Sequence, residues 1–424
     1  RLLSNMIIKN KDIKLAIIGL GYVGLPLAVE FAKKKKVIGF DINKNRINEL
    51  NNGLDKNFEI RKKKLKRLKK LKFTNDKKEL KKANCFIITV PTPVDEFKKP
   101  DLNPLFKASK LIGKIIKKGD LVIYESTVYP GCTEEYCVPI LEKYSKLKLN
   151  KDFYCGYSPE RINPGDKKHK LNKITKIVSG SNAHASKFIS SIYKNITKEK
   201  IFISKSIQVA EASKVIENIQ RDINIALMNE LSIIFNKLNI DFNEVLKASN
   251  TKWNFLNFKP GLVGGHCIGV DPYYLADLAI KNKIYPKIIL AGRKLNDTMS
   301  DYIVDNVRKK INKNAKILLI GLSFKEDVPD YRNSQSLNII QKLIKKGFNL
   351  DTFDTLINFK EVGVSKHFSS FKNLKNKNYD LILILVGNRE IKNKGIVFFK
   401  KLLKPNGLLF DIKNIFKNKS DFKL

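Results

Sequence analysis

The chain has 424 residues but few cysteines, few histidines and no long apolar run, and each shortage excludes a class of protein. Its five cysteines are an odd number without Cys-x-x-Cys spacing, which argues against a disulfide framework and structural zinc, so we expect no metal. No stretch of about 18 apolar residues occurs, so neither a transmembrane helix nor membrane association is expected. The first residues are too polar for a signal peptide. We expect Met6 to be the natural start, residues 1–5 to be an upstream extension, and a reducing cytoplasm to be the location.

Acidic residues are also scarce: 82 basic residues oppose 41 acidic ones, and the formal net charge is +41. Such a charge is typical of proteins that bind nucleic acid or another polyanion. However, only ten of the basic residues are arginine, and the lysines are spread along the chain, as in proteins encoded by AT-rich genomes. We therefore expect no nucleic-acid partner, although the positive field would attract an anionic substrate. The densest run, RKKKLKRLKKLK (61–72), spaces Leu65, Leu68 and Leu71 as on one face of a helix.

Apolar segments alternate with helical ones over the first 200 residues, which predicts a parallel sheet with helices on both faces. The expected strands are 14–20, 36–41, 84–90, 120–126 and 153–158. The segment 208–237 has no proline or glycine and has apolar residues at helical period, so one long helix is expected there. More helix is expected to about 248 and from about 273 to 312. Strands return at 316–324, 349–354, 380–386 and 407–412.

The two strand-rich parts of the chain open alike, with KLAIIGL (14–20) and KILLIGL (316–322). We therefore predict an α/β protein with two Rossmann-like, doubly wound parallel-sheet domains joined by a long central helix and a helical middle domain. The predicted domains are residues 1–205, 206–312 and 313–424.

A glycine motif, Gly19-Leu-Gly21-Tyr-Val-Gly24, follows the first predicted strand. In this context the first glycine makes a tight turn, the second lets the backbone approach a pyrophosphate, and the third lets helix and strand pack closely. Asp41 stands twenty residues after Gly21, at the end of the next strand. A carboxylate there accepts a ribose 2′-hydroxyl and repels a 2′-phosphate, so the motif predicts NAD rather than NADP.

Three later strands end in polar segments, which are Val90-Pro-Thr92, Glu125-Ser-Thr127 and Ser158-Pro-Glu160-Arg161. Ligands bind beyond the carboxyl ends of parallel strands, so these side chains are expected to face the same crevice as the glycine motif. Any one of them could be an ordinary capping residue, but three polar strand ends together indicate a binding site.

Cys267 lies in a glycine-rich segment, GGHCIGVDPYYL (264–275). A metal would need more ligands than the adjacent His266 and the nearby Asp271, and a buried, inert cysteine is the usual alternative. A nucleophile near bound NAD fits better, because a thiolate adds to an aldehyde and the adduct can be oxidised again to a thioester. One site would then oxidise an alcohol to an acid. This chemistry needs an oxyanion stabiliser, and Lys214 and Asn218 share one face of the predicted long helix.

Together these segments resemble the UDP-glucose/GDP-mannose dehydrogenases, a family of NAD-dependent four-electron oxidases of nucleotide sugars. The resemblance covers the chain from Met6 onward and rests on eight motifs in the family's order. The motifs are GLGYVGLPLA (19–28), FDINKNRI (40–47), VPTPVDE (90–96), ESTVYPG (125–131), SPERINPG (158–165), AEASKVIEN (210–218), GGHCIGVDPYYL (264–275) and GLSFKEDVPDYRNS (321–334).

The resemblance implies a catalytic role for six matching positions, of which Glu160 would also contact the substrate. Cys267 would form the thiohemiacetal and then the thioester. Lys214 and Asn218 would stabilise the oxyanion. Asp271, together with Thr127 and a water, would transfer protons.

The resemblance also implies which residues bind the two ligands. Those expected to hold NAD are Gly19, Gly21, Tyr22, Val23, Gly24, Asp41, Arg46, Thr92, Thr127 and Arg332. Those expected to contact the UDP-sugar are Glu160, Arg161, Lys214, Asn218, Phe258, Gly261, Gly264, His266 and Lys325. Glu160 would also assist hydrolysis of the thioester, and the loop 258–265 would clasp the sugar and phosphates.

Within the family, the segment 252–275 is most similar to the UDP-N-acetylhexosamine 6-dehydrogenases of surface-polysaccharide pathways, such as those of Vi antigen and O antigen. The expected substrate is therefore UDP-GlcNAc or UDP-GalNAc, with UDP-glucose or GDP-mannose as the alternative. UDP-glucose enzymes often carry a second glutamate shortly after Ser-Pro-Glu, and here Glu160 is followed by Arg161-Ile-Asn-Pro instead. The resemblance also implies a homodimer formed through the central helix. A basic nucleic-acid-binding protein is the remote alternative, supported only by the charge.

Overall fold

The computed structural model describes residues 13–162, 171–265, 268–374, 378–417 and 419–424. The chain divides into two compact units. The first comprises Arg1–Glu217 and Tyr273–Ile284, and the second comprises Asn218–Pro272 and Tyr285–Leu424. This division passes through a long helix, so the three-domain boundaries expected from the sequence stay a prediction.

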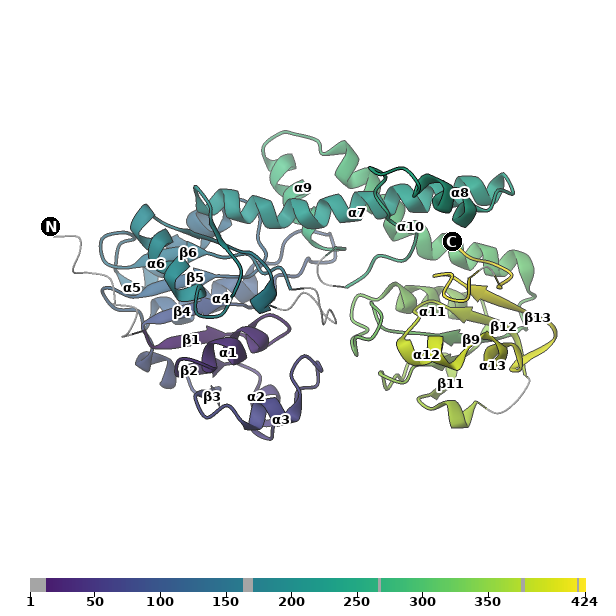
Figure 1. Ribbon diagram of the computed structural model, residues 1–424, viewed down its shortest axis with the longest axis horizontal. Coiled ribbons are helices and arrows are strands. Elements are labelled where there is room, and N and C mark those ends of the chain that lie inside the picture. The colour runs from purple at the N-terminus through teal and green to yellow at the C-terminus, as the bar shows by residue number, and fades with distance from the viewer. Residues whose placement is uncertain (1–12, 163–170, 266–267, 375–377, 418) are drawn as a thin grey trace. The chain divides into compact units, whose positions relative to one another are not determined.

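The first unit is built around an eight-stranded sheet in the order β3-β2-β1-β4-β5-β6-β7-β8 (Figure 1). Its strands are β1 Leu15–Ile18, β2 Val37–Phe40, β3 Leu71–Thr74, β4 Cys85–Ile88, β5 Leu121–Tyr124, β6 Tyr154–Tyr157, β7 Lys176–Gly180 and β8 Ile201–Ile203. Strands β1 to β6 are parallel, whereas β7 runs antiparallel to β6, and β8 is parallel to β7. The strand order reverses between β1 and β4, and doubly wound sheets bind ligands at such a position.

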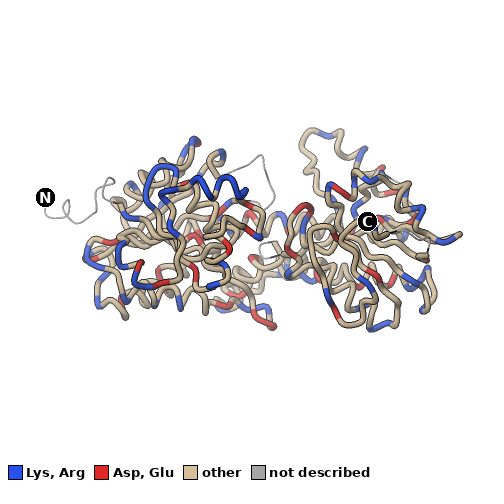
Figure 2. Tube along the Cα trace, turned by 90° about the horizontal axis from the view of Figure 1, so that it is seen from below, with Lys and Arg blue, Asp and Glu red and all other residues tan. Residues whose placement is uncertain are grey.

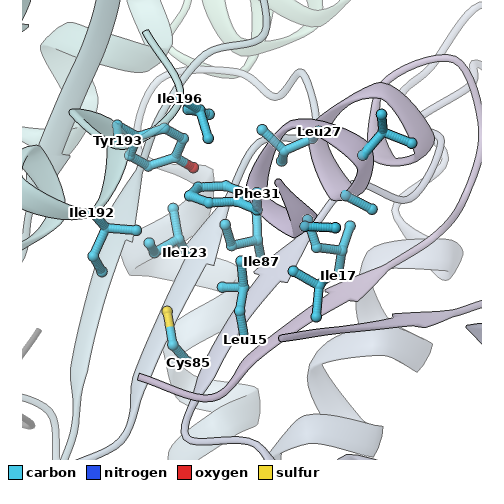
Figure 3. Close-up of a cluster of buried hydrophobic side chains, with 14 of the residues drawn as sticks. Leu15, Ile17, Leu27, Phe31, Cys85, Ile87, Ile123, Ile192, Tyr193 and Ile196 are labelled. Atoms are coloured by element: carbon cyan, nitrogen blue, oxygen red, sulfur yellow. The ribbon is translucent and has the colours of Figure 1, made fainter. Parts of the chain in front are cut away.

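The central strands β1, β4 and β5 are apolar throughout because both of their faces are buried. Leu15 and Ile17 of β1 pack with α1 (Gly24–Ala32) and α6 (Ala183–Tyr193), as Figure 3 shows. Ala16 and Ile18 face the opposite core, which includes α4 (Asn103–Gly113) and α5 (Val138–Ser145). The two cores fix the strand ends from which the site is built.

The long helix expected at 208–237 is α7, Ile207–Lys237. It is followed by α8 (Phe242–Ser249). The helix expected from about 273 to 312 is two helices, α9 (Asp271–Lys281) and α10 (Lys287–Lys310). The break occurs because Lys283 adopts a left-handed φ of 60° and Pro286 precedes α10. No helix of the described residues has the length and apolar character needed to cross a membrane.

The second unit contains a five-stranded parallel sheet in the order β11-β10-β9-β12-β13. Its strands are β9 Lys316–Ile320, β10 Asn349–Phe353, β11 Val364–Phe368, β12 Tyr379–Ile384 and β13 Leu403–Asp411. Helices α10 and α11 (Gln335–Lys345) pack on one face, and α12 (Arg389–Lys394) and α13 (Ile396–Lys400) pack on the other. The expected fold class, two Rossmann-like units with a long central helix, is confirmed.

The two sheets repeat one hydrogen-bonded arrangement after their first strands. The Leu20 N–H donates to Asp41 Oδ2 at 2.8 Å, and the Leu322 N–H donates to Asp354 Oδ2 at 2.8 Å. The similar openings of the two halves therefore have a structural basis. Asp354 is fully buried, whereas Asp41 is partly exposed. Of these two carboxylates, Asp41 is the one that a ribose hydroxyl could reach.

The lysine-rich run 61–72 differs from its prediction. Only Lys62–Lys66 forms a helix, α3, which buries Leu65. Leu71 instead begins β3, because it pairs with Val37 of β2 at the edge of the sheet. The preceding helix, α2 (Lys44–Asn51), is capped by the Asn43 side chain.

Candidate active site

The glycine motif forms the turn between β1 and α1. Gly19 has a φ of 96°, a conformation that residues with a side chain rarely adopt. A Cβ on Gly24 would lie 1.8 Å from the Gly19 carbonyl oxygen, whereas a Cβ on Gly21 would contact nothing within 4 Å. Tyr22 and Val23 are half-buried, and Val23 is the N-cap of α1. Open space beside Gly21, at the start of a helix, fits the pyrophosphate of a dinucleotide.

Asp41 and Arg46 both lie against this turn. The Asp41 carboxylate accepts the Leu20 N–H and, through Oδ1, the Asn43 N–H at 2.9 Å. Each of its oxygens keeps a second lone pair for a ribose hydroxyl. Arg46 Nε donates to the Leu20 carbonyl at 2.9 Å, and Nη2 pairs with the buried Asp55 at 2.8 Å. Arg46 therefore links the glycine turn to Asp55 and stabilises it. A contact of Arg46 with NAD stays a prediction.

The polar strand ends expected to line the crevice follow β4, β5 and β6, which are adjacent in the sheet. Thr92 and Thr127 are half-buried at this edge. Ser126 Oγ donates to the Val90 carbonyl at 2.6 Å and so ties the end of β5 to the end of β4. The first unit thus brings these residues to the same edge as the glycine turn, where parallel strands end.

Glu160 follows β6 and is 4% exposed. Its Oε1 accepts the backbone N–H groups of Arg161 and Ile162. Its Oε2 has no hydrogen-bond partner among the described residues and lies 3.5 Å from Lys176 Nζ. The Arg161 guanidinium pairs with Glu217 of α7, with 2.8 Å between Nη2 and Oε1. Arg161 is therefore held against α7, three residues after Lys214.

Two charged residues lie beside Glu160: Glu125, from a polar strand end expected to face the crevice, and Lys176, which the sequence did not indicate. Lys176 Nζ donates to Glu125 Oε2 at 2.8 Å, and the Tyr193 hydroxyl donates to Glu125 Oε1. All three side chains are buried. Burial raises the pKa of the Glu125 carboxyl above its ordinary value, although Lys176 acts in the opposite direction. Glu125 stood at a recognised polar strand end, but nothing in the sequence distinguishes Lys176 from the other lysines.

Lys214 and Asn218 lie one turn apart on α7 and are 8% and 5% exposed. A lysine in so basic a chain is usually a solvated surface charge, and Lys214 is not. Asn218 Nδ2 donates to Oδ2 of Asp271, the first residue of α9. Asp271 is 2% exposed and lies at a helix N-terminus, where the backbone dipoles favour a carboxylate. Lys214, Asn218 and Asp271 are thus all buried polar residues, and their catalytic roles stay a prediction.

Glu211 is a further residue that the sequence did not single out, although it lies inside the AEASKVIEN motif. Its Oε2 accepts the Gly131 N–H at 2.6 Å, and its Oε1 accepts the Thr133 N–H at 2.9 Å. Burial raises the pKa of Glu211 to about 7. Glu211 joins the segment after Thr127 to α7, one turn before Lys214.

The segment 258–265 precedes Cys267 and belongs to the second unit. Phe258 packs against a cluster of apolar residues from α7 and α8. Gly261 exchanges hydrogen bonds with Asn229 of α7 through both of its backbone groups. His266 and Cys267 lie outside the described residues.

The end of this segment leaves no room for a side chain. A Cβ on Gly264 would lie 2.6 Å from the Asn333 carbonyl oxygen, and the Gly265 N–H donates to that oxygen at 3.0 Å. Gly265 also has a φ of 83°. The glycines before Cys267 therefore pack against the turn after β9, which explains the glycine-rich sequence.

Lys325 and Arg332 both lie in this turn, beyond the carboxyl end of β9. Lys325 is half-buried. Arg332 Nη2 pairs with Asp330 Oδ2 at 2.6 Å, and its side chain is 63% exposed. The expected contacts of Lys325 with UDP and of Arg332 with NAD stay predictions.

The positive charge is not gathered in one place. Figure 2 shows Lys and Arg scattered along the trace of both units, with Asp and Glu between them. Across the described ranges, no three His, Cys, Asp or Glu side chains are arranged to hold a metal ion. The scattered lysines accord with a bias of composition.

Three models of one family match the chain in order. In the UDP-glucose/GDP-mannose dehydrogenase family, the NAD binding domain matches residues 13–227, the central domain 208–298 and the UDP binding domain 318–418. The UDP-N-acetyl-D-glucosamine 6-dehydrogenase of Pseudomonas aeruginosa is 51% identical, over 98% of this chain and 100% of that protein. The protein of the same name from Salmonella typhi is 50% identical, over 95% and 96%. The solved structure of the UDP-D-ManNAc dehydrogenase from Pyrococcus horikoshii has a TM-score of 0.85 at 29% identity, over 97% and 98%.

Proposed function

The chain belongs to the UDP-glucose/GDP-mannose dehydrogenase family and is an NAD-dependent nucleotide-sugar dehydrogenase, and we propose that its substrate is a UDP-N-acetylhexosamine. The observation that carries this proposal is its identity of 50% and 51% to two UDP-N-acetyl-D-glucosamine 6-dehydrogenases. Five UDP-N-acetyl-D-mannosamine dehydrogenases are 33% to 36% identical. The reaction would convert the C6 hydroxyl to a carboxylate, for the synthesis of a surface polysaccharide.

The glycine turn would hold the cofactor. The Gly21 backbone would approach the pyrophosphate, and Asp41 would accept a ribose hydroxyl. Thr92 and Thr127, at the ends of β4 and β5, would line the nicotinamide half of the crevice. NAD, when bound, accepts an electron pair in each of the two oxidations.

Cys267 would carry the sugar between the two oxidations. Its thiolate would add to the C6 aldehyde, and oxidation of the adduct would leave a thioester. Lys214 and Asn218 would stabilise the negative oxygen in each step, and the burial of both side chains strengthens that interaction. Asp271, which accepts a hydrogen bond from Asn218, would exchange protons with Thr127 through a water. Glu160 would assist the water that hydrolyses the thioester.

The second unit would bind the nucleotide, because the family's UDP binding domain matches residues 318–418. Lys325 would pair with the diphosphate, and the segment 258–265, with Gly261 and Gly264, would enclose the sugar and phosphates. Arg161 and His266 would add polar contacts to the sugar.

A homodimer through α7 is also proposed. This helix exposes a row of large apolar side chains, which a second copy of the helix would cover. They are Val209, Ile216, Leu227 and Ile234. We propose the cytoplasm as the location, since Cys85, Cys132, Cys137 and Cys155 are free and buried, as is usual in a reducing compartment.

The substrate and the thioester route are tested by offering UDP-GlcNAc, UDP-GalNAc, UDP-glucose and GDP-mannose in turn. The proposal predicts the highest kcat/KM for a UDP-N-acetylhexosamine. It also predicts that Cys267→Ser forms no uronic acid while still binding NAD. Normal acid formation by Cys267→Ser would refute the thioester route, and a preference for UDP-glucose would refute the substrate.

A further inference from the structure

Lys176 is a buried cation between two carboxylates of the first unit. Its Nζ lies 2.8 Å from Glu125 Oε2 and 3.5 Å from Glu160 Oε2, and its side chain is 2% exposed. It also lies 3.4 Å from the Pro159 carbonyl oxygen. The three donors of the ammonium thus have three oxygens within reach. Lysine is almost never fully buried unless it is paired, so Lys176 differs from the solvated lysines of this chain.

The direction of β7 explains why Lys176 is there. Strand β7 is antiparallel to β6, with Tyr157 opposite Ser179. Continuing this register by three residues brings Glu160 opposite Lys176. In a parallel β7, the first residue would lie at the far edge of the sheet. Because β7 is antiparallel, its first residue, Lys176, lies at the edge of the sheet where β5 and β6 end. The polar residues of the candidate site lie at the same edge.

The Lys176 ammonium also contacts residues of two further elements, Glu125 after β5 and Tyr193 of α6. Glu125 stands at the end of β5, and Tyr193 of α6 donates its hydroxyl to Glu125 Oε1. The Tyr193 ring lies 5.2 Å from Lys176 Nζ, within the range of a cation–π interaction. The ring also makes an edge-type contact with Phe31, with 5.8 Å between ring centroids, inside the apolar core that Figure 3 shows. The cluster is anchored in the core and does not depend on a mobile side chain.

Among the described residues, the cation that faces Glu160 is Lys176 of this cluster. One oxygen of Glu160 is occupied by two backbone N–H groups, and the other faces Lys176. Within the described part of the chain, the titratable groups that face Lys176 are Glu125 after β5, Glu160 after β6 and Tyr193 from α6. Two carboxylates in one buried place repel each other, so without a cation one of them would take up a proton.

We propose that Lys176 is a positioning residue for hydrolysis of the acyl-enzyme, and that its charge holds the Glu160 carboxylate in place to receive a proton from the attacking water. This inference rests on the proposed thioester route. In the step, the water oxygen bonds to the acyl carbon and one water proton passes to Glu160. The carbon–sulfur bond breaks, and its electron pair moves to the Cys267 sulfur. Glu160 then returns the proton to the thiolate, so no oxidant or reductant is needed.

The experiment compares Lys176→Met, which removes the charge at similar length, with Lys176→Arg, which keeps it. In rapid-mixing kinetics, Lys176→Met should form two NADH per site in a burst and then turn over about 100-fold more slowly, a loss typical of impaired proton transfer. Its acyl-enzyme should be visible in the mass of the intact protein. Its kcat should recover at higher pH, because two carboxylates without a countercharge ionise at higher pH. Lys176→Arg should keep the wild-type turnover rate and the wild-type pH profile.

A matched control is offered by the second unit. There Lys316 Nζ lies 3.3 Å from Asp351 Oδ2 and 5.3 Å from the Tyr379 ring, and the Tyr379 hydroxyl donates to Asp351. Lys316→Met removes a similar cation at the opposite, amino-terminal edge of its sheet and should leave the pH profile unchanged.

Two results would overturn the inference. One is Lys176→Met with no burst and a wild-type pH profile. The other is a kcat of Lys176→Met that is lowered equally at every pH, together with a lower melting temperature. That result would show that Lys176 has only a structural role. If Lys176→Met does not fold, Lys176→Gln keeps a polar side chain without the charge, and an unshifted pH profile in that variant would equally overturn the inference. A wild type that forms no NADH would instead refute the proposed function, and the inference with it.

Discussion

Asn229 of α7 binds both polar groups of the Gly261 peptide. Its Oδ1 accepts the Gly261 N–H at 2.8 Å, and its Nδ2 donates to the Gly261 carbonyl at 3.0 Å. The second Nδ2 proton goes to Asn296 Oδ1 at 2.8 Å, and Asn296 in turn donates to Asp222, which pairs with the buried Arg293. A continuous buried network thus fixes the segment 258–265, which we expect to enclose the sugar.

Asn229→Ala should loosen that segment. The substitution leaves a buried peptide without partners, which typically costs about 1–3 kcal/mol of unfolding free energy. We expect the KM for the UDP-sugar to rise about tenfold, equivalent to about 1.4 kcal/mol of binding, with little change in the KM for NAD. Steady-state kinetics and chemical denaturation measure both effects. Asn224→Ala is the control, because Asn224 lies on the same helix and, among the described residues, its side chain hydrogen-bonds the Gln220 carbonyl alone. Equal KM values for the sugar in Asn229→Ala and wild type would refute the role.

The glycine turn predicts a separation of folding from cofactor binding. In Gly24→Ala the new Cβ would lie 1.8 Å from the Gly19 carbonyl oxygen and 2.4 Å from Thr89 Oγ1, so the melting temperature should fall. In Gly21→Ala the Cβ meets nothing, so the fold should survive. NAD affinity should nevertheless fall by about tenfold or more, because the methyl group occupies the approach of the pyrophosphate. Thermal denaturation measures the stability of each variant, and titration calorimetry measures its affinity for NAD. Normal NAD affinity in Gly21→Ala would contradict the assignment of this turn as the pyrophosphate site.

Asp41→Asn should weaken the choice of NAD over NADP. The amide keeps one oxygen to accept the Leu20 N–H but no longer repels a 2′-phosphate. The ratio of kcat/KM for NAD to that for NADP should fall by about tenfold, or about 1.4 kcal/mol. Asn45→Ala, a nearby exposed substitution, should leave the ratio as it is. An unchanged ratio in Asp41→Asn would mean that another group selects the cofactor.

Glu211 makes the stability of the first unit depend on pH. Burial raises its pKa in the folded protein from 4.5 to about 7. The folded state therefore holds a proton that the unfolded chain has already released. Its contribution to the free energy of unfolding is full below about pH 4.5 and is lost as the pH rises through about 7.

Glu211→Gln stays neutral and should remove this dependence. The amide loses one of the two hydrogen bonds to Gly131 and Thr133, so the variant should be less stable at pH 5. Between pH 5 and pH 7.5, however, its unfolding free energy should fall less than that of the wild type. Urea denaturation at the two pH values measures this, with the exposed Glu135→Gln as control. If the unfolding free energy of Glu211→Gln and of the wild type changed equally between the two pH values, Glu211 would not titrate in this range.

The local pattern of apolar residues and glycines in the sequence was enough to predict much of this fold. The first five strands expected and the long helix α7 follow from the periodicity of apolar residues, and the turn at Gly19 follows from a conformation that only glycine adopts easily. Long-range pairing was not predictable in the same way. Leu71 looked helical beside Leu65 and Leu68, but pairing with β2 makes it the start of a strand.

Some residues of the candidate site could likewise be predicted from local motifs, whereas one depends on long-range strand pairing. Asp41, Glu160 and Lys214 stand in motifs and could be identified from the sequence, although their roles stay proposals. Lys176 could not, because its place beside Glu160 depends on the antiparallel direction of β7, a strand that the sequence did not indicate. In a chain with so many lysines, only burial and contact distinguish this one.

The most direct test of the account is the number of NADH molecules formed per molecule of sugar consumed. Limiting UDP-GlcNAc would be mixed with the purified protein and excess NAD, and the final absorbance at 340 nm would be compared with the uronic acid formed. A four-electron oxidation through a thioester gives two NADH and one uronic acid per sugar. One NADH per sugar, with an aldehyde as the product, would contradict it.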